Sequence, residues 1–355
     1  MSEPPLLSKL RTLIRANGPM SVAEYMAHCL TDAEHGYYTT RDPFGAAGDF
    51  ITAPEVSQMF GEIVGAWVIE MWRRSGAPEP VRLTELGPGR GTLMVDVMRV
   101  AAHAPDFFRT ASIHLVETSP TLRQRQAETL RSTGIEPNWH ASFNEVPAGP
   151  LLLVANEFFD ALPVRQFVRL DVWRERAIGL DVRGRLGFGI GPGVLESSPE
   201  ARQGSILEIR PAAEALVAEI AERIVADGGA ALIIDYGHDE TAPGETLQAM
   251  QGHAFCDPLA EPGEADLTAH VDFGALAGEA RRAGAATHGP MPQGEFLTAL
   301  GLVERARRLG ANADDSVREA LRAAVERVAG PDEMGALFKV LALTPPGVVP
   351  PPFDQ

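Results

Sequence analysis

The sequence contains few cysteines and no long apolar run, and each shortage excludes a class of protein. Cys29 and Cys256 are its only two thiols and stand far apart, so neither a disulfide scaffold nor a cysteine-based metal site is expected. No apolar run approaches the roughly 20 residues that span a bilayer. Residues 1–9 lack the basic and apolar pattern of a signal peptide. We therefore expect a soluble, cytoplasmic protein without membrane insertion.

Positive charge is also scarce. The chain carries 31 basic and 48 acidic residues, for a formal net charge of −17, and only Lys9 and Lys339 are lysines. A field of this sign repels phosphate backbones, so nucleic acid is not expected as a partner. The 355 residues are 45% hydrophobic and 22% charged, which is typical of a globular chain with two domains or one enlarged domain.

From residue 81 onward, apolar strands alternate with helices. Strands are expected at residues 81–86, 112–117, 150–155, 230–235 and 337–343. Short apolar strands in this pattern predict an α/β fold with a mostly parallel sheet covered by helices on both faces. Residues 163–210 interrupt the pattern with alternating apolar and polar residues and many glycines, which predicts antiparallel hairpins.

The N-terminal part contains two helix-start signals and a long irregular segment between them. Ser21 and Glu24 are spaced as a capping box, and Thr52 and Glu55 predict a second box that opens a helix with an apolar stripe up to Met71. The segment between them, residues 37–52, is rich in glycine and aromatic residues. A loop of this length is either disordered or functional, and its aromatics favour a function.

A glycine-rich loop, Gly87-Pro88-Gly89-Arg90-Gly91-Thr92, follows a strand and opens a helix. A phosphate-binding P-loop would need a lysine after the last glycine, and a dinucleotide loop would need its third glycine at Thr92. Glu85, two residues before the first glycine, suits an amino group better than a pyrophosphate. S-adenosylmethionine, which has an α-amino group, a ribose diol and no phosphate, therefore fits best, and a nicotinamide oxidoreductase is disfavoured.

Two more strand ends carry polar residues that suit this cofactor. Glu117 ends the strand after the glycine loop and can accept hydrogen bonds from both ribose hydroxyls. Asn156 and Glu157 follow the next strand, where ligands bind in open α/β sheets. The alternative for Glu157 is that it caps a following helix. No zinc-hydrolase or serine-esterase motif occurs, and no metal is expected. The residues expected to bind S-adenosylmethionine are Glu85, Gly87, Gly89, Gly91, Glu117 and Asn156.

The chain resembles the MidA-type class I methyltransferases. The resemblance rests on residues 44–58, 85–91, 114–120, 155–163, 235–237, 265–273 and 334–340, and so covers nearly the whole chain. It implies a Rossmann-like, seven-stranded class I methyltransferase sheet with an N-terminal helical lid and a β-hairpin insertion, and S-adenosylmethionine as methyl donor. It also implies an arginine acceptor, with symmetric dimethylarginine formed on a quinone-proximal core subunit of respiratory complex I, whose assembly the family's mitochondrial members serve.

The pattern of expected elements, together with the resemblance, suggests how the chain is divided. We expect an N-terminal helical and lid region at residues 1–78, the S-adenosylmethionine-dependent methyltransferase domain at residues 79–162 and 211–355, and the antiparallel insertion at residues 163–210.

An arginine acceptor would need acidic residues around it. A guanidinium is planar and cationic, so carboxylates can hold it. Glu157 and Asp160 are the expected catalytic residues, with Asp49 from the lid as a third, and Phe50, Thr52 and Tyr236 are expected to contact the substrate. Two alternatives remain: a small-molecule methyltransferase, and an assembly factor that keeps the fold without turnover.

Overall fold

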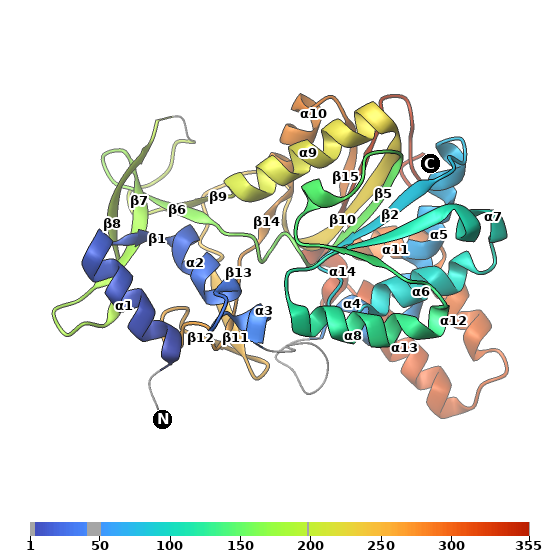
Figure 1. Cartoon of the computed structure of the whole chain (residues 1–355), viewed down its shortest axis with the longest axis horizontal. Coiled ribbons are helices and arrows are strands. Elements are labelled where there is room, and N and C mark those ends of the chain that lie inside the picture. Colours follow the sequence, from blue (N-terminus) through green and yellow to red (C-terminus); the bar gives the residue numbers. More distant parts are fainter. Residues whose placement is uncertain (1–3, 41–50, 197–198, 355) are drawn as a thin grey trace. The chain divides into compact units, whose positions relative to one another are not determined.

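The computed structural model describes residues 4–40, 51–196 and 199–354. The chain divides into two compact units, each assembled from stretches that are distant in sequence (Figure 1). Unit 1 consists of Met1–Phe50, Asp160–Ala215 and Glu240–Asp272. Unit 2 consists of Ile51–Phe159, Leu216–Asp239 and Phe273–Gln355. The domain boundaries expected from the sequence stay a prediction.

Unit 2 is built on a mixed sheet whose strands lie in the order β15-β16-β10-β5-β2-β3-β4. Five neighbouring strands of this sheet are parallel: β4 (Asn138–His140), β3 (Ala111–Val116), β2 (Val81–Leu86), β5 (Leu151–Asn156) and β10 (Gly229–His238). β16 (Phe338–Thr344) pairs antiparallel with both β10 and β15 (Ala286–Pro292). The mostly parallel sheet expected from the sequence is confirmed.

Helices cover this sheet because its strands are apolar on both faces. Leu152 and Val154 of β5 belong to the same core as α5 (Gln58–Arg74) and α6 (Thr92–Ala101). Leu151 and Leu153 are equally buried and point to the opposite face. Figure 1 shows helices on both sides of the strands. The remaining helices of unit 2 are α7 (Pro105–Thr110), α8 (Pro120–Leu130), η1 (Arg131–Thr133), η2 (Phe143–Glu145), α10 (Phe273–Arg282), α11 (Gln293–Ala299), α12 (Leu302–Gly310), α13 (Asp315–Ala329) and α14 (Met334–Leu337).

The strands lie close to their predicted positions. β2 has the bounds expected from the sequence, and β3, β5 and β16 are each displaced by one residue. β10 continues past the expected end at Asp235 to His238.

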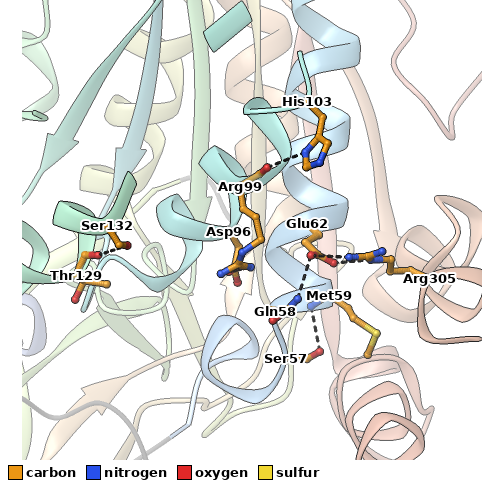
Figure 2. A network of polar contacts seen from close by, with 10 residues as sticks. All are labelled: Ser57, Gln58, Met59, Glu62, Asp96, Arg99, His103, Thr129, Ser132 and Arg305. Atoms are coloured by element: carbon orange, nitrogen blue, oxygen red, sulfur yellow. Dashed lines mark hydrogen bonds and ion pairs between the residues drawn. The ribbon is translucent and has the colours of Figure 1, made fainter. Parts of the chain in front are cut away.

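The capping box predicted at Thr52 is wrong. The helix that begins there, α4 (Ala53–Val56), ends after one turn, and Thr52 makes no side-chain capping bond. Ser57 is extended, with φ −157°, and its hydroxyl accepts the Met59 N–H at 3.2 Å, so Ser57 caps the long helix α5 (Figure 2). The apolar period runs through this break, which is why the sequence suggests a single helix. The capping box of Ser21 and Glu24 is confirmed at α2 (Val22–Thr31).

Unit 1 combines short helices with two small antiparallel sheets. α1 (Pro5–Asn17) and α2 share a core with β13. The larger sheet has the order β1-β7-β6-β9, with β8 pairing β7, and the smaller has the order β12-β11-β13. The hairpins predicted within residues 163–210 are therefore confirmed. The other elements of this unit are β1 (Met20–Ser21), α3 (Tyr37–Thr40), β6 (Arg165–Arg169), β7 (Trp173–Leu180), β8 (Leu186–Leu195), β9 (Ile206–Ile209), β11 (Gln248–Gln251), β12 (Ala254–Cys256), β13 (Asp266–Thr268) and β14 (Val271–Asp272).

One helix, α9 (Pro211–Asp227), contributes residues to both units. Across the residues that the structure describes, no helix combines the length and the apolar character needed to cross a membrane.

Candidate active site

Four parallel strands of unit 2 end at the same edge of the sheet. Leu86 at the end of β2 pairs with Val116 of β3 and with Ala155 of β5, and Asn156 of β5 pairs with Ile234 of β10. The strand order reverses at β2, with later strands on either side of it. Ligands of open α/β sheets bind beyond the carboxyl ends of strands at such a reversal.

The glycine loop begins directly after β2 and contains three glycines with a left-handed backbone conformation. Gly87, Gly89 and Gly91 have φ values of 61°, 51° and 84°, a backbone region that residues with a side chain rarely adopt. A Cβ atom on Gly87 would lie 2.7 Å from the ring of Phe158, so the loop after β5 packs closely on this glycine. Gly91 is the N-cap of α6, which leaves the first N–H groups of that helix facing the loop.

Glu85 is buried beside this loop. Its side chain is 3% exposed, and among the described residues its Oε2 atom has no hydrogen-bond partner. Burial raises the pKa of the Glu85 carboxyl to about 8. A buried carboxyl oxygen without a partner is costly, and a ligand that donates a hydrogen bond to it would remove that cost.

Glu117 lies at the end of β3 and is held by its own surroundings. Its Oε1 atom accepts the Ser119 N–H at 2.7 Å, and its Oε2 atom accepts the Gln126 amide at 3.2 Å. Burial raises the pKa of this carboxyl, and the two hydrogen bonds oppose the rise. Gln126 also donates to the Gly89 carbonyl at 2.8 Å and accepts the Trp139 indole N–H at 2.8 Å. Gln126 therefore connects Glu117 to the glycine loop.

The end of β5 presents Asn156 and Glu157. Glu157 has φ +51°, a left-handed conformation that costs a non-glycine residue about 1–3 kcal/mol. Its Oε1 atom accepts the Asn156 amide and the Ala53 N–H, each at 3.1 Å. No helix directly follows Glu157, so the alternative that it caps a following helix is wrong; its carboxylate accepts the first N–H of α4. The Oδ1 atom of Asn156 is buried and has no partner among the described residues.

Asp235, near the end of β10, binds the backbone of the Glu157 loop. Its side chain is fully buried, and its Oδ2 atom accepts the N–H groups of Phe158 at 3.2 Å and of Phe159 at 2.9 Å. Its Oδ1 atom accepts the N–H of Tyr236 at 2.9 Å. The sequence places Asp235 at a strand end but gives no sign of these contacts.

Of the expected substrate residues, Thr52 and Tyr236 are described and both belong to unit 2. Thr52 is buried at the start of α4, and half-buried Tyr236 packs on Phe338 with ring centroids 5.4 Å apart. Asp160 is the first residue of its stretch in unit 1 and is 6% exposed. Asp49 and Phe50 lie outside the described residues.

Sequence reasoning missed Gln126 and the role of Asp235. Gln126 stands between Leu122 and Leu130 on the buried face of α8, and a polar residue in such an apolar stripe is the available signal. Nothing local marks Asp235, because its partners lie about 77 residues earlier in the chain. Within residues 4–40, 51–196 and 199–354, no group of His, Cys, Asp or Glu is arranged to hold a metal ion.

The chain is similar to proteins of known family. Residues 63–291 match the family described as "Putative S-adenosyl-L-methionine-dependent methyltransferase". The chain is 39% identical over 368 residues to the Danio rerio protein named protein arginine methyltransferase NDUFAF7, mitochondrial, and the match covers 95% of this chain and 86% of that protein. Identity to the Homo sapiens protein of the same name is 37% over 370 residues, covering 96% of this chain and 83% of that protein.

A solved structure gives the same result for the fold and the cofactor. A Burkholderia thailandensis protein described as a "likely methyl transferase", bound to S-adenosyl-homocysteine, matches with a TM-score of 0.84 at 29% identity, over 96% of this chain and 91% of that chain. The class I methyltransferase fold expected from the sequence is confirmed.

The cellular location expected from the sequence is wrong. The two NDUFAF7 relatives are both named mitochondrial proteins, which contradicts the cytoplasmic location expected from the sequence.

The residues at the strand ends fit the cofactor of this family. The buried Oε2 atom of Glu85 and the buried Oδ1 atom of Asn156 receive no hydrogen bond from the residues that the structure describes, and the left-handed glycines leave the loop after β2 without side chains at three positions. The chain belongs to this family of S-adenosylmethionine-dependent methyltransferases.

Proposed function

We propose that the protein methylates arginine side chains of another protein, with a quinone-proximal core subunit of respiratory complex I as substrate and symmetric dimethylarginine as product. The relatives named protein arginine methyltransferase support the arginine acceptor. The complex I subunit and the symmetric product rest on the family resemblance in the sequence. The methylation would support assembly of the complex.

Each of the cofactor residues has a role in this proposal. Glu85 binds the α-amino group, since the Oε2 atom of its buried carboxyl lacks a hydrogen-bond donor among the described residues. Gly87, Gly89 and Gly91 let the backbone approach the ligand, and Glu117, held by Gln126, accepts the ribose hydroxyls. Asn156 contributes its buried Oδ1 atom.

Glu157 is the residue proposed to hold the acceptor arginine. It stands in a strained conformation at the end of β5, beside the glycine loop that Phe158 contacts. Strained residues of this kind cluster at active sites. A carboxylate there can hold a guanidinium plane and localise a lone pair on one nitrogen. Asp160 and Asp49 are proposed as further carboxylates, and Phe50, Thr52 and Tyr236 as residues that contact the substrate.

Methyl transfer would be an in-line displacement in which the acceptor nitrogen forms a bond to the methyl carbon that S-adenosylmethionine supplies while the bond from that carbon to sulfur breaks. S-adenosyl-homocysteine would leave, and the proton lost from the nitrogen would pass to a neighbouring carboxylate or to water. The protein's own residues mainly position the reactants, a contribution that reaches about 7–11 kcal/mol in well-oriented reactions. Glu157 orients the acceptor nitrogen, and the bond from Ala53 N–H fixes one oxygen of this carboxylate.

Replacement of Glu157 by glutamine tests the proposal. Glutamine keeps an oxygen that can accept the Ala53 and Asn156 hydrogen bonds but removes the charge. We expect unchanged affinity for S-adenosylmethionine and a rate of methyl transfer lower by about 100- to 10,000-fold, the range for a positioned general acid or base. The measurements are calorimetry and methyl incorporation into the complex I subunit, with mass spectrometry to locate the modified residue.

Glu128→Gln, on an exposed position of α8, is the matched control and should retain full activity. Full activity of Glu157→Gln, or a modified lysine or carboxylate in place of arginine, would defeat the proposal. Methylation of a small molecule with the subunit left unmodified would favour the small-molecule alternative.

A further inference from the structure

We propose that Asp235 is a positioning residue that fixes the loop carrying Glu157; this inference rests on the proposed role of Glu157. Asp235 comes from β10, whereas Glu157 follows β5, and these neighbouring parallel strands end side by side. Asp235 would act on the reaction through the backbone of residues 157–159, without touching the substrate.

Successive N–H groups of this loop all bind to β10. The Glu157 N–H donates to the Ile234 carbonyl at 2.8 Å. The next two N–H groups, of Phe158 and Phe159, converge on the Oδ2 atom of Asp235 at 3.2 and 2.9 Å. The loop backbone is thus held along its whole length by one strand and one side chain.

A carboxylate is the side chain that this arrangement requires. One oxygen takes two loop N–H groups while the other takes the N–H of Tyr236 at 2.9 Å, so both oxygens must be acceptors. Hydrogen bonds to an ionised acceptor are shorter and stronger than neutral ones. An asparagine would turn an amide donor toward one of these N–H groups and would lose at least one bond.

The same contacts explain how Glu157 keeps its left-handed backbone. A non-glycine residue stays at φ +51° only where its surroundings determine the conformation. The bonds on either side of its Cα atom, through its own N–H and that of Phe158, supply this constraint. Without Asp235, the loop can relax to an ordinary conformation and turn the Glu157 side chain away.

Phe158 connects the loop that carries Glu157 to the glycine loop. Its ring lies 2.7 Å from the position that a Cβ atom on Gly87 would take, so the two loops are in close contact. A shift of the loop therefore changes the position of Glu157 relative to the glycine loop. A displacement of about 1 Å at a reacting group can cost about 100-fold in rate.

A double-mutant cycle tests the inference in the full-length protein. Asp235→Asn, Glu157→Gln and the double variant are compared for the rate of methyl transfer to the complex I subunit. We expect Asp235→Asn alone to lower the rate about 10- to 100-fold. If Asp235 acts through Glu157, the double variant is no slower than Glu157→Gln. Losses that multiply would overturn the inference.

The outcomes separate this inference from the proposed function. Full activity of Glu157→Gln removes the proposed function and the inference together. A slow Glu157→Gln variant whose loss multiplies with that of Asp235→Asn overturns only the inference. Asp227→Asn is the matched control and should keep full activity. Asp227 also accepts a backbone N–H, that of Gly149 at 2.9 Å, but it precedes the start of β10, at the opposite end of this strand from Asp235.

Hydrogen exchange of the unmodified protein gives a test that does not depend on a variant folding. The amides of Phe158 and Phe159 should exchange as slowly as those within β10, although they lie in a loop. Fast exchange of these two amides beside a protected β10 would also overturn the inference.

Discussion

Glu85 has one buried carboxyl oxygen to which no residue that the structure describes donates a hydrogen bond. Burial raises its pKa to about 8, far above the ordinary value near 4.3. The folded protein without ligand therefore binds this proton more tightly than the unfolded chain does. The stability contributed by the bound proton is fully present below about pH 4 and is lost as the pH rises toward 8.

We expect cofactor binding to release the proton of Glu85. An ammonium group beside the carboxylate lowers its pKa, so the affinity for S-adenosyl-homocysteine should rise roughly tenfold for each pH unit between about 6 and 7.5. Calorimetry in two buffers with different heats of ionisation measures the proton released. Glu85→Gln should bind more weakly and with little pH dependence between these limits. A pH-independent affinity of the unmodified protein would count against the contact between Glu85 and the amino group.

Individual site residues differed in how far the sequence could identify them. Glu85 and the glycines belong to one short local pattern, and Glu117 follows from the end of the next strand. The contacts of Gln126 and Asp235 join residues that are 37 and 77 positions apart, so they depend on the folded sheet. The signal for such residues is a buried polar side chain, and burial is only approximately visible in a sequence.

At the scale of single elements, the apolar pattern predicted the strands well and one helix boundary badly. The strands are short apolar runs bounded by turn residues, which fixes their position within a residue at most ends. Hydrophobic spacing from Val56 to Met71 continues across Ser57, where the backbone is extended. A one-residue break leaves the period nearly unchanged, so spacing alone cannot locate it.

The cap at Ser57 leads to a prediction for α5. Ser57→Ala removes the acceptor for the Met59 N–H and should lower the free energy of unfolding by about 1 kcal/mol. Ser57→Thr keeps a hydroxyl oxygen at this position and should change the stability by less than about 0.5 kcal/mol. Urea unfolding followed by circular dichroism measures both. Equal losses in the two variants would show that packing at Ser57, rather than capping, stabilises the helix.

At the scale of the whole molecule, each compact unit is assembled from separate stretches of the chain. Unit 1 gathers Met1–Phe50, Asp160–Ala215 and Glu240–Asp272. Its core joins Leu6 and Tyr25 to Leu267, which local spacing cannot anticipate because these contacts span most of the sequence. The sheet of unit 2 was easier to predict, since its strands and helices alternate in a regular order.

All the cofactor residues proposed above lie in unit 2, so a ligand should stabilise this unit selectively. At about 100 times its Kd, S-adenosyl-homocysteine should add about 2.7 kcal/mol to the stability of the unit that binds it. Amides of β2, β5 and β10 that exchange only by unfolding should then exchange about 100-fold more slowly, because each 1.4 kcal/mol corresponds to a factor of ten. Amides in the core of unit 1, such as those of α1 and α2, should slow less. NADH at the same concentration is the control and should change neither unit. Equal slowing in both units would show that they unfold together, and slowing confined to unit 1 would place the cofactor elsewhere.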